Sequence, residues 1–106
     1  MAAITITDVP ATGLADLPLV AANAGGDTVA YGSKQAAGWE QYSVVLFVRN
    51  ADTGPHVVTV GGVPVTVANA KTGVIPVPNE GLNDASVAVT YDGVTNVTVA
   101  AARILP

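Results

Sequence analysis

The sequence predicts a single all-β domain, an antiparallel β-sandwich of Ig-like or jelly-roll-like type with about seven or eight short strands. Three observations predict this class. The 106 residues are enough for one domain but not for two. Strand formers dominate, with 19 valines and 11 threonines against one methionine. The 11 glycines and 7 prolines are spread along the chain, where they separate short apolar runs.

The N-terminal part predicts one strand followed by an irregular stretch. Within residues 3–9, Ile4 and Ile6 alternate with threonines, which is the period of a strand with one buried face. Residues 11–27 break this pattern with glycines and a proline, so we expect either one short helical turn or an extended arm there. Residues 1–27 are thus expected to form a strand plus an arm of the domain 1–106.

Two further strands are predicted in the middle of the chain. Residues 28–31 favour a short strand, and residues 32–41 favour a loop. Residues 43–50 differ from the other strands because they are apolar on both faces from 44 to 48. Such a strand is expected to be covered on both sides, by the second sheet of its own domain on one face and by something else on the other.

A valine hairpin is predicted around the Gly-Gly pair at 61–62, between residues 56–60 and 63–68. A two-residue turn there pairs Val60 with Val63 and Val58 with Val65, so that all four valines point to one face. Pro64 places its strand at the edge of a sheet, because proline has no N–H to donate to a neighbouring strand.

The C-terminal part predicts a second hairpin. Residues 74–78 are another proline-bearing stretch, and residues 79–84 are a turn region. Residues 86–91 and 97–104 favour two strands that pair around the Asp-Gly pair at 92–93. A connection of odd length places on one face the residues Val87, Val89, Tyr91, Val97 and Val99.

The residues that carry chemistry form no catalytic or metal-binding motif. The chain has no cysteine, which excludes disulfides, thiolate zinc sites and cysteine nucleophiles. The single histidine, His56, follows a Gly-Pro turn and is expected at the surface or at an interface. Most aspartates lie beside turn residues, whose backbone N–H groups their carboxylates bind. We therefore expect no catalytic residue, no metal and no cofactor.

The composition favours a protein partner. Four cationic residues against eight acidic ones give a net charge of −4, which disfavours binding to nucleic acid. No apolar run reaches the roughly 18 residues of a membrane span. The N-terminus alternates like a strand and lacks the pattern of a secretory signal, so synthesis in the cytoplasm is expected.

An apolar interaction surface is expected, because a small domain with a mean hydropathy of +0.48 and 11% charged residues has little polar surface. The candidate interface residues are the two-sided apolar strand and three aromatic residues near it, namely Val44, Val45, Leu46, Phe47, Val48, Tyr31, Trp39 and Tyr42. The three aromatic side chains either pack at one end of the domain or at a subunit contact, or stack on a ligand.

Several segments together resemble the small head decoration, or cement, proteins of tailed bacteriophages. These segments are residues 4–14, 26–29, 46–51, 57–60, 74–78 and 87–103. The resemblance implies a β-sandwich that binds the outside of an assembled head, often as a homotrimer at local three-fold positions, and bridges subunits of the major capsid protein. It implies no catalysis, and it implies a location on the virion. The alternative is a carbohydrate- or surface-binding module of a phage tail or cell envelope, suggested by the three aromatic residues.

Overall fold

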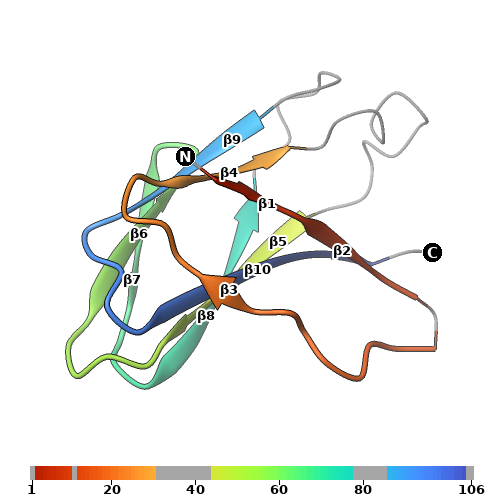
Figure 1. Cartoon of the computed structure of the whole chain (residues 1–106), viewed down its shortest axis with the longest axis horizontal. Helices are drawn as coiled ribbons and strands as arrows, with labels where there is room; N and C mark the ends of the chain where they lie inside the picture. The colour runs from red at the N-terminus through yellow and green to blue at the C-terminus, as the bar shows by residue number, and fades with distance from the viewer. Residues whose placement is uncertain (1, 11, 31–43, 78–85, 105–106) are drawn as a thin grey trace.

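The computed structural model describes residues 2–10, 12–30, 44–77 and 86–104. Within these residues the chain forms ten strands and no helix (Figure 1). The strands are β1 (Ala2–Ile4), β2 (Ile6–Val9), β3 (Val20–Ala21), β4 (Asp27–Ala30), β5 (Val44–Asn50), β6 (His56–Val60), β7 (Val63–Val67), β8 (Lys71–Val77), β9 (Ser86–Tyr91) and β10 (Val97–Ile104). The first sheet has the order β1-β4-β9-β6-β7 and the second β2-β10-β5-β8, with β3 paired to β10 outside that order.

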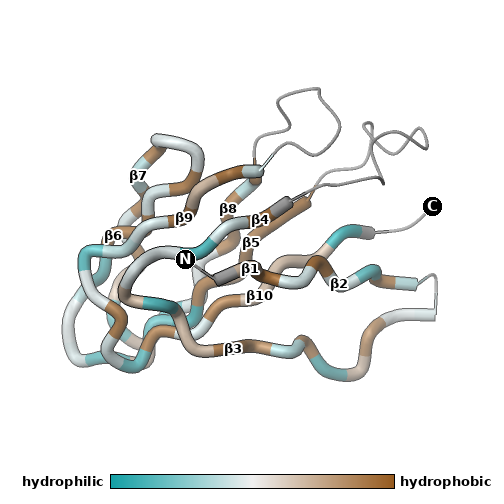
Figure 2. The backbone as a smooth tube through the Cα atoms, turned by 45° about the horizontal axis from the view of Figure 1, so that its top comes forward, coloured by the Kyte–Doolittle hydropathy of each residue, from teal (hydrophilic) through white to brown (hydrophobic). Residues whose placement is uncertain are grey.

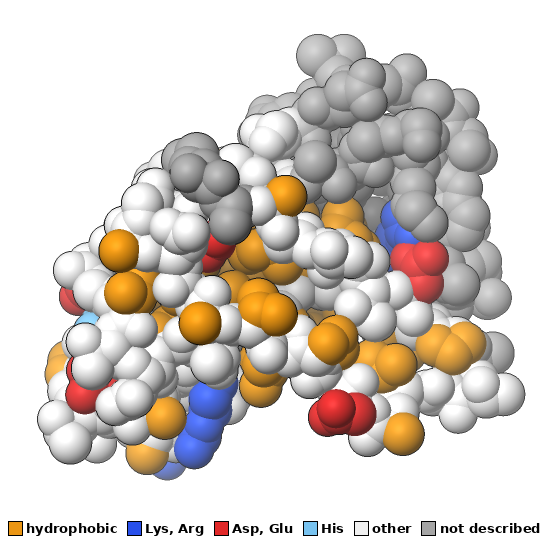
Figure 3. All heavy atoms as spheres, in the orientation of Figure 1, with side chains coloured by type: hydrophobic (Ala, Val, Ile, Leu, Met, Phe, Trp, Pro, Cys, Tyr) orange, Lys and Arg blue, Asp and Glu red, His pale blue; other side chains and the backbone are white. Residues whose placement is uncertain are grey.

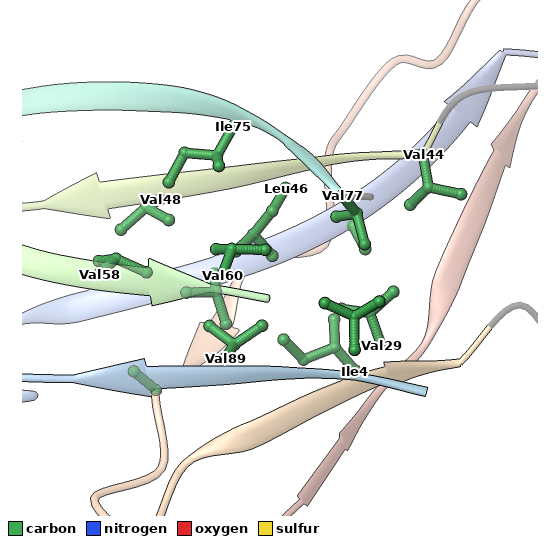
Figure 4. Close-up of a cluster of buried hydrophobic side chains, with 14 of the residues drawn as sticks. Ile4, Val29, Val44, Leu46, Val48, Val58, Val60, Ile75, Val77 and Val89 are labelled. Atoms are coloured by element: carbon green, nitrogen blue, oxygen red, sulfur yellow. The ribbon is translucent and has the colours of Figure 1, made fainter. Parts of the chain in front are cut away.

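The hydrophobic core draws residues from both sheets. Along β5, Val44, Leu46 and Val48 have no exposed surface, whereas the residues between them are half-buried. Figure 4 shows side chains of β5 and β8 pointing toward those of β4, β6 and β9. In Figure 2, hydrophobic stretches occur in strands of both sheets. The core is rich in valine, whose branched side chain suits the surface of a pleated sheet.

The N-terminal segment is two strands rather than the single strand predicted for residues 3–9. β1 pairs with β4 in the first sheet, and β2 pairs with β10 in the second, so the chain changes sheets at Thr5. Ile4 lies in the core and Ile6 packs against it, which explains why the alternation continues across the change. Both pairings are parallel, whereas the other strand pairings are antiparallel, so the two sheets are mixed and the predicted antiparallel arrangement holds in part.

The segment between β2 and β4 is largely irregular and contains two hydrogen-bonded turns, at residues 10–13 and 23–26. Residues 12–19 contain no helical turn, and β3 adds only two residues, Val20 and Ala21, to the edge of β10. Ala22 then enters the core, and its N–H donates to the carbonyl of Val97 at 3.0 Å. This favours an arm over the helical turn, and the arm is fastened to the second sheet at β3.

The valine hairpin is confirmed. β6 and β7 pair in the predicted register, with Val60 opposite Val63 and Val58 opposite Val65. Gly61 and Gly62 have φ values of 57° and 86°, a combination that glycine adopts without strain in a two-residue turn. β7 is an edge strand, as the proline predicted.

The second hairpin was predicted wrongly, because β9 and β10 lie in different sheets. β9 pairs with β4 and β6, whereas β10 pairs with β5, β2 and β3. The residues 92–96 cross between the sheets, so the valines of the two strands reach the core from opposite sides.

The strand count also exceeds the prediction, because the first strand is divided and both β3 and β8 are additional. The predicted loops at 32–41 and 79–84 lie outside the described residues.

Candidate interaction surface

The outer face of the first sheet mixes threonines with apolar residues. The strand registers place four threonines on the face opposite the core valines, namely Thr28, Thr59, Thr66 and Thr90. The residues paired with three of them on this face are apolar, namely Ala88, Pro64 and Val57. Threonine combines strand propensity with a hydroxyl group that binds water. The threonines therefore give this face part of the polar character expected of a β-sheet surface in contact with solvent.

The outer face of the second sheet is apolar over six adjacent positions on three strands. These positions form two rows that cross β10, β5 and β8. One row is Ala102, Val45 and Pro76, and the next is Ala100, Phe47 and Val74. We call these six residues the outer apolar face. The row beyond them is polar, with Thr98, Arg49 and Thr72. A sheet face in water is usually polar, so this apolar face is a candidate contact surface.

Exposure on the outer apolar face increases toward the β8 edge. Ala100 and Ala102 are buried, Val45 and Phe47 are half-buried, and Val74 is 59% exposed. The space-filling view in Figure 3 shows one side of the molecule, on which hydrophobic side chains lie among few charged ones. The part of the outer apolar face most accessible to a partner is therefore the edge formed by β8.

A cavity of about 250 Å³ adjoins this edge. Its lining is apolar and comes from both sheets, namely Val60, Val63, Val65, Ile75 and Pro76. Val63 is 60% exposed at its rim, and Pro76 belongs also to the outer apolar face. The accessible apolar surface thus continues from the outer face of β8 to the edge strand β7.

Both strands beside this cavity are edge strands that carry a proline. Pro64 lies in β7 and Pro76 lies in β8, at the two sheet edges where no further strand is paired within the described residues. Proline has no N–H, so it weakens the pairing of an edge with a strand from another molecule. A partner at this edge is expected to contact side chains rather than to extend the sheet.

The predicted interface residues divide into three groups in the structure. Val44, Leu46 and Val48 have no exposed surface and belong to the core, so they offer nothing to a partner of the folded chain. Val45 and Phe47 point outward into the outer apolar face. The aromatic residues Tyr31, Trp39 and Tyr42 lie outside the described residues. Sequence reasoning did not identify Val74 and Pro76, because only the register of β8 against β5 brings them to Phe47 and Val45.

His56 lies between two carboxylates rather than in a metal site. Its Nε2 atom is 2.8 Å from Oδ2 of Asp52, and its Nδ1 atom is 2.9 Å from Oδ1 of Asp92. Hydrogen bonds to Asp52 and then Asp92 raise the pKa of His56 above its ordinary value. The hydrogen bond from His56 lowers the pKa of both carboxyl groups. Sequence reasoning missed this group, because Asp92 is distant in the chain.

Two further acidic side chains pair with groups from distant strands. The hydroxyl of Tyr91 donates to Oδ2 of Asp27 at 2.6 Å, and Asp27 is buried. Burial, followed by the contact with Asp27, raises the pKa of the Tyr91 hydroxyl. The guanidinium of Arg103 donates to Asp8, which joins β10 to β2 on the inner side of the second sheet. The sequence had indicated that most aspartates are turn residues. Asp27 and Asp8 instead bind side chains of distant strands.

Asn50 is a fully buried amide that joins three parts of the chain. Its Nδ2 atom donates to the carbonyls of Gly54 and Val67, each at 2.9 Å, and its Oδ1 atom accepts the N–H of Asp52 at 3.0 Å. Because a buried amide needs its hydrogen bonds, this arrangement fixes the end of β5 against β7 and the residues 51–55.

Comparison with known proteins assigns no family to the chain. No protein-family model, no curated protein and no solved structure matches it. Among the described residues no group of three or more histidine, aspartate or glutamate side chains is arranged to hold a metal ion. No helix in this part of the chain is long and apolar enough to cross a membrane. The outer apolar face is the feature of the described residues that bears most directly on function.

Proposed function

We propose that this chain is a structural virion protein, a decoration protein that binds the outer surface of a phage head and stabilises it by bridging capsid subunits. The observation that carries the proposal is the outer apolar face, with Val74 59% exposed at its β8 edge. The resemblance of several segments to head decoration proteins supports the same function. The proposed partners are the major capsid protein and further copies of the chain, as a homotrimer.

The contrast between the two outer faces gives the physical reason. On the first sheet threonines are paired with apolar residues, whereas on the second sheet two adjacent rows across three strands contain no polar residue. Removing apolar surface from water contributes about 25 cal/mol per Å². Each copy needs only a modest affinity for the shell if copies are linked to one another. Linked copies bind with an avidity that exceeds the affinity of each single contact. The proposal includes a β-sandwich of Ig-like or jelly-roll-like type, and it includes no catalysis, cofactor, nucleic acid or membrane.

The test is binding to empty heads of the phage that encodes the chain, purified without their decoration protein. Co-sedimentation is measured for the natural chain, for Val74→Lys and for Thr66→Lys. The two variants are matched, because each adds one lysine at an exposed position of an edge strand, β8 in one case and β7 in the other. Lysine is well tolerated on edge strands, so both variants are expected to fold.

The natural chain is expected to saturate the heads at a ratio set by their symmetry positions and to raise their thermal disruption temperature. Complete burial of a valine contributes about 1.5–3 kcal/mol, and 59% of the Val74 side chain is exposed, so Val74→Lys is expected to weaken binding by roughly tenfold. Thr66→Lys is expected to bind like the natural chain. No binding to heads, or equal loss in both variants, would contradict the proposal, and binding to a glycan instead would favour the carbohydrate-binding alternative.

A further inference from the structure

Two connections that cross between the sheets meet at one end of the molecule. Residues 51–55 lead from β5 in the second sheet to β6 in the first, and residues 92–96 lead from β9 in the first sheet to β10 in the second. Figure 1 shows both at the left end of the molecule. A backbone hydrogen bond joins them directly, from the N–H of Ala51 to the carbonyl of Asn96 at 2.9 Å.

His56 joins the same two connections through its side chain. The ring lies between Asp52 of the first connection and Asp92 of the second, with 2.8 and 2.9 Å between the nitrogen and oxygen atoms. An ionised carboxylate only accepts hydrogen bonds, so each ring nitrogen must carry a proton to make its contact. The neutral ring has a single N–H and therefore satisfies only one of the two carboxylates.

We propose that Asp52, His56 and Asp92 form a proton-dependent clip between the two inter-sheet connections. The clip is closed while the imidazole carries both protons. When the ring loses one proton, a lone pair faces a carboxylate at hydrogen-bond distance, and that contact opens. This device is independent of the proposed function, because it concerns the folded chain alone.

The surroundings of the clip indicate that Asp92 is the partner released. The side chain of Asp92 is 47% exposed and that of Asp52 is 24% exposed. Both carboxylates also accept backbone N–H groups, from Thr53 at Asp52 and from Val57 and Gly93 at Asp92. The greater exposure of Asp92 to water therefore distinguishes the two partners. The neutral ring is therefore expected to keep its proton on Nε2, toward Asp52.

Among the described residues, the charged side chains that form a hydrogen bond or ion pair with the ring are those of Asp52 and Asp92 alone. The residue opposite His56 on β7 is Val67, which is apolar. On the side of residues 92–96, a Cβ added to Gly93 would lie 3.2 Å from the Cε1 atom of the ring, so the ring packs against backbone there. Asp52 and Asp92 are thus the groups that govern the proton equilibrium of His56.

The pH range of the closed clip follows from the directions of the pKa shifts. The pKa of His56 is raised above 6.5, so its contribution is complete below pH 6.5 and is lost as the pH rises through the raised pKa. The pKa values of Asp52 and Asp92 are lowered below 3.8, so their contribution is complete above pH 3.8 and is lost as the pH falls through the lowered values. The clip is closed between these limits.

The test is an NMR titration of the full chain with nitrogen-15 in the imidazole ring, together with amide hydrogen exchange at each pH. We expect a pKa of His56 above 6.5 and an Nε2–H tautomer above that pKa. Each pKa unit by which His56 exceeds 6.5 corresponds to about a tenfold preference of the protonated ring for the closed clip. The Ala51 and Asp92 amides, which donate to Asn96 and Val57, are expected to lose protection as the ring deprotonates.

The Gly61 amide is the internal control for the ordinary pH dependence of exchange, because it donates to Ala88 at the β6–β7 turn. The variant Asp92→Asn removes one charge and is expected to lower the pKa of His56 while the chain remains folded. A pKa at or below 6.5, a pKa unchanged in Asp92→Asn, or equal loss of protection at Gly61 and Asp92 would overturn the proposal. The titration of the natural chain decides the matter even if the variant fails to fold.

Discussion

Replacing Asn50 with alanine tests how the end of β5 is held. The natural side chain is fully buried and makes three hydrogen bonds, to the carbonyls of Gly54 and Val67 and from the N–H of Asp52. Alanine removes all three bonds, so the carbonyls of Gly54 and Val67 and the N–H of Asp52 lose their hydrogen-bond partner. The expected result is a large loss of stability with little change of fold, because the surrounding strands keep their ladder partners.

The magnitude follows from the number of bonds and from their burial. Each intramolecular hydrogen bond contributes about 1 kcal/mol, and a buried polar group left without a partner costs about 1–3 kcal/mol. The carbonyl of Val67 is the acceptor in a buried bond, so the expected loss is about 3–5 kcal/mol. The total stability of a domain of this size is about 5–15 kcal/mol, and the Tm is expected to fall by roughly 12–20 °C.

The assay is thermal and urea unfolding followed by circular dichroism, with Asn23→Ala as the matched control. Asn23 makes an exposed turn contact, in which its Oδ1 atom accepts the N–H of Gly25 at 2.9 Å. The same substitution there is expected to cost less than about 1 kcal/mol. Equal losses in the two variants, or a loss below about 1 kcal/mol for Asn50→Ala, would refute the reasoning about the buried amide.

Two further substitutions test close packing and a buried pair. A Cβ at Gly73 would lie 2.9 Å from Cγ2 of Val67, so Gly73→Ala is expected to cost about 1–3 kcal/mol in urea unfolding. Adding Val67→Ala should make the combined loss smaller than the sum of the single losses, and simple additivity would contradict the contact. Tyr91→Phe removes the donor to buried Asp27 and is expected to cost about 1–3 kcal/mol, and an unchanged Tm would contradict this.

Local patterns in the sequence were sufficient for individual strands. The Gly-Gly pair at 61–62 defined the turn, the register and, with Pro64, the edge position of β7. The alternation of valines also predicted that Val89 and Val99 face the core. In each case the pattern and its consequence lie within a few residues of one another, so no information about the rest of the fold was required.

The pairing of strands and the polar contacts could not be predicted in this way. The turn at 92–93 is compatible with both a hairpin and a crossing between sheets, and only the other ladder partners of β10 decide between them. Asp27 and Tyr91 are 64 positions apart, and His56 and Asp92 are 36 apart, so neither contact has a local signal. The outer apolar face depends likewise on the register of β8 against β5.

The most direct test of the proposed contact surface uses the absence of cysteine from the chain. Val74→Cys and Thr66→Cys each introduce a single thiol, on the outer face of the second and the first sheet respectively. The rate of maleimide labelling is measured for the free chain and for the chain bound to phage heads. We expect both thiols to react when free, and only the thiol at position 74 to be protected on the head. Undiminished labelling at position 74, or protection at position 66 instead, would contradict the account.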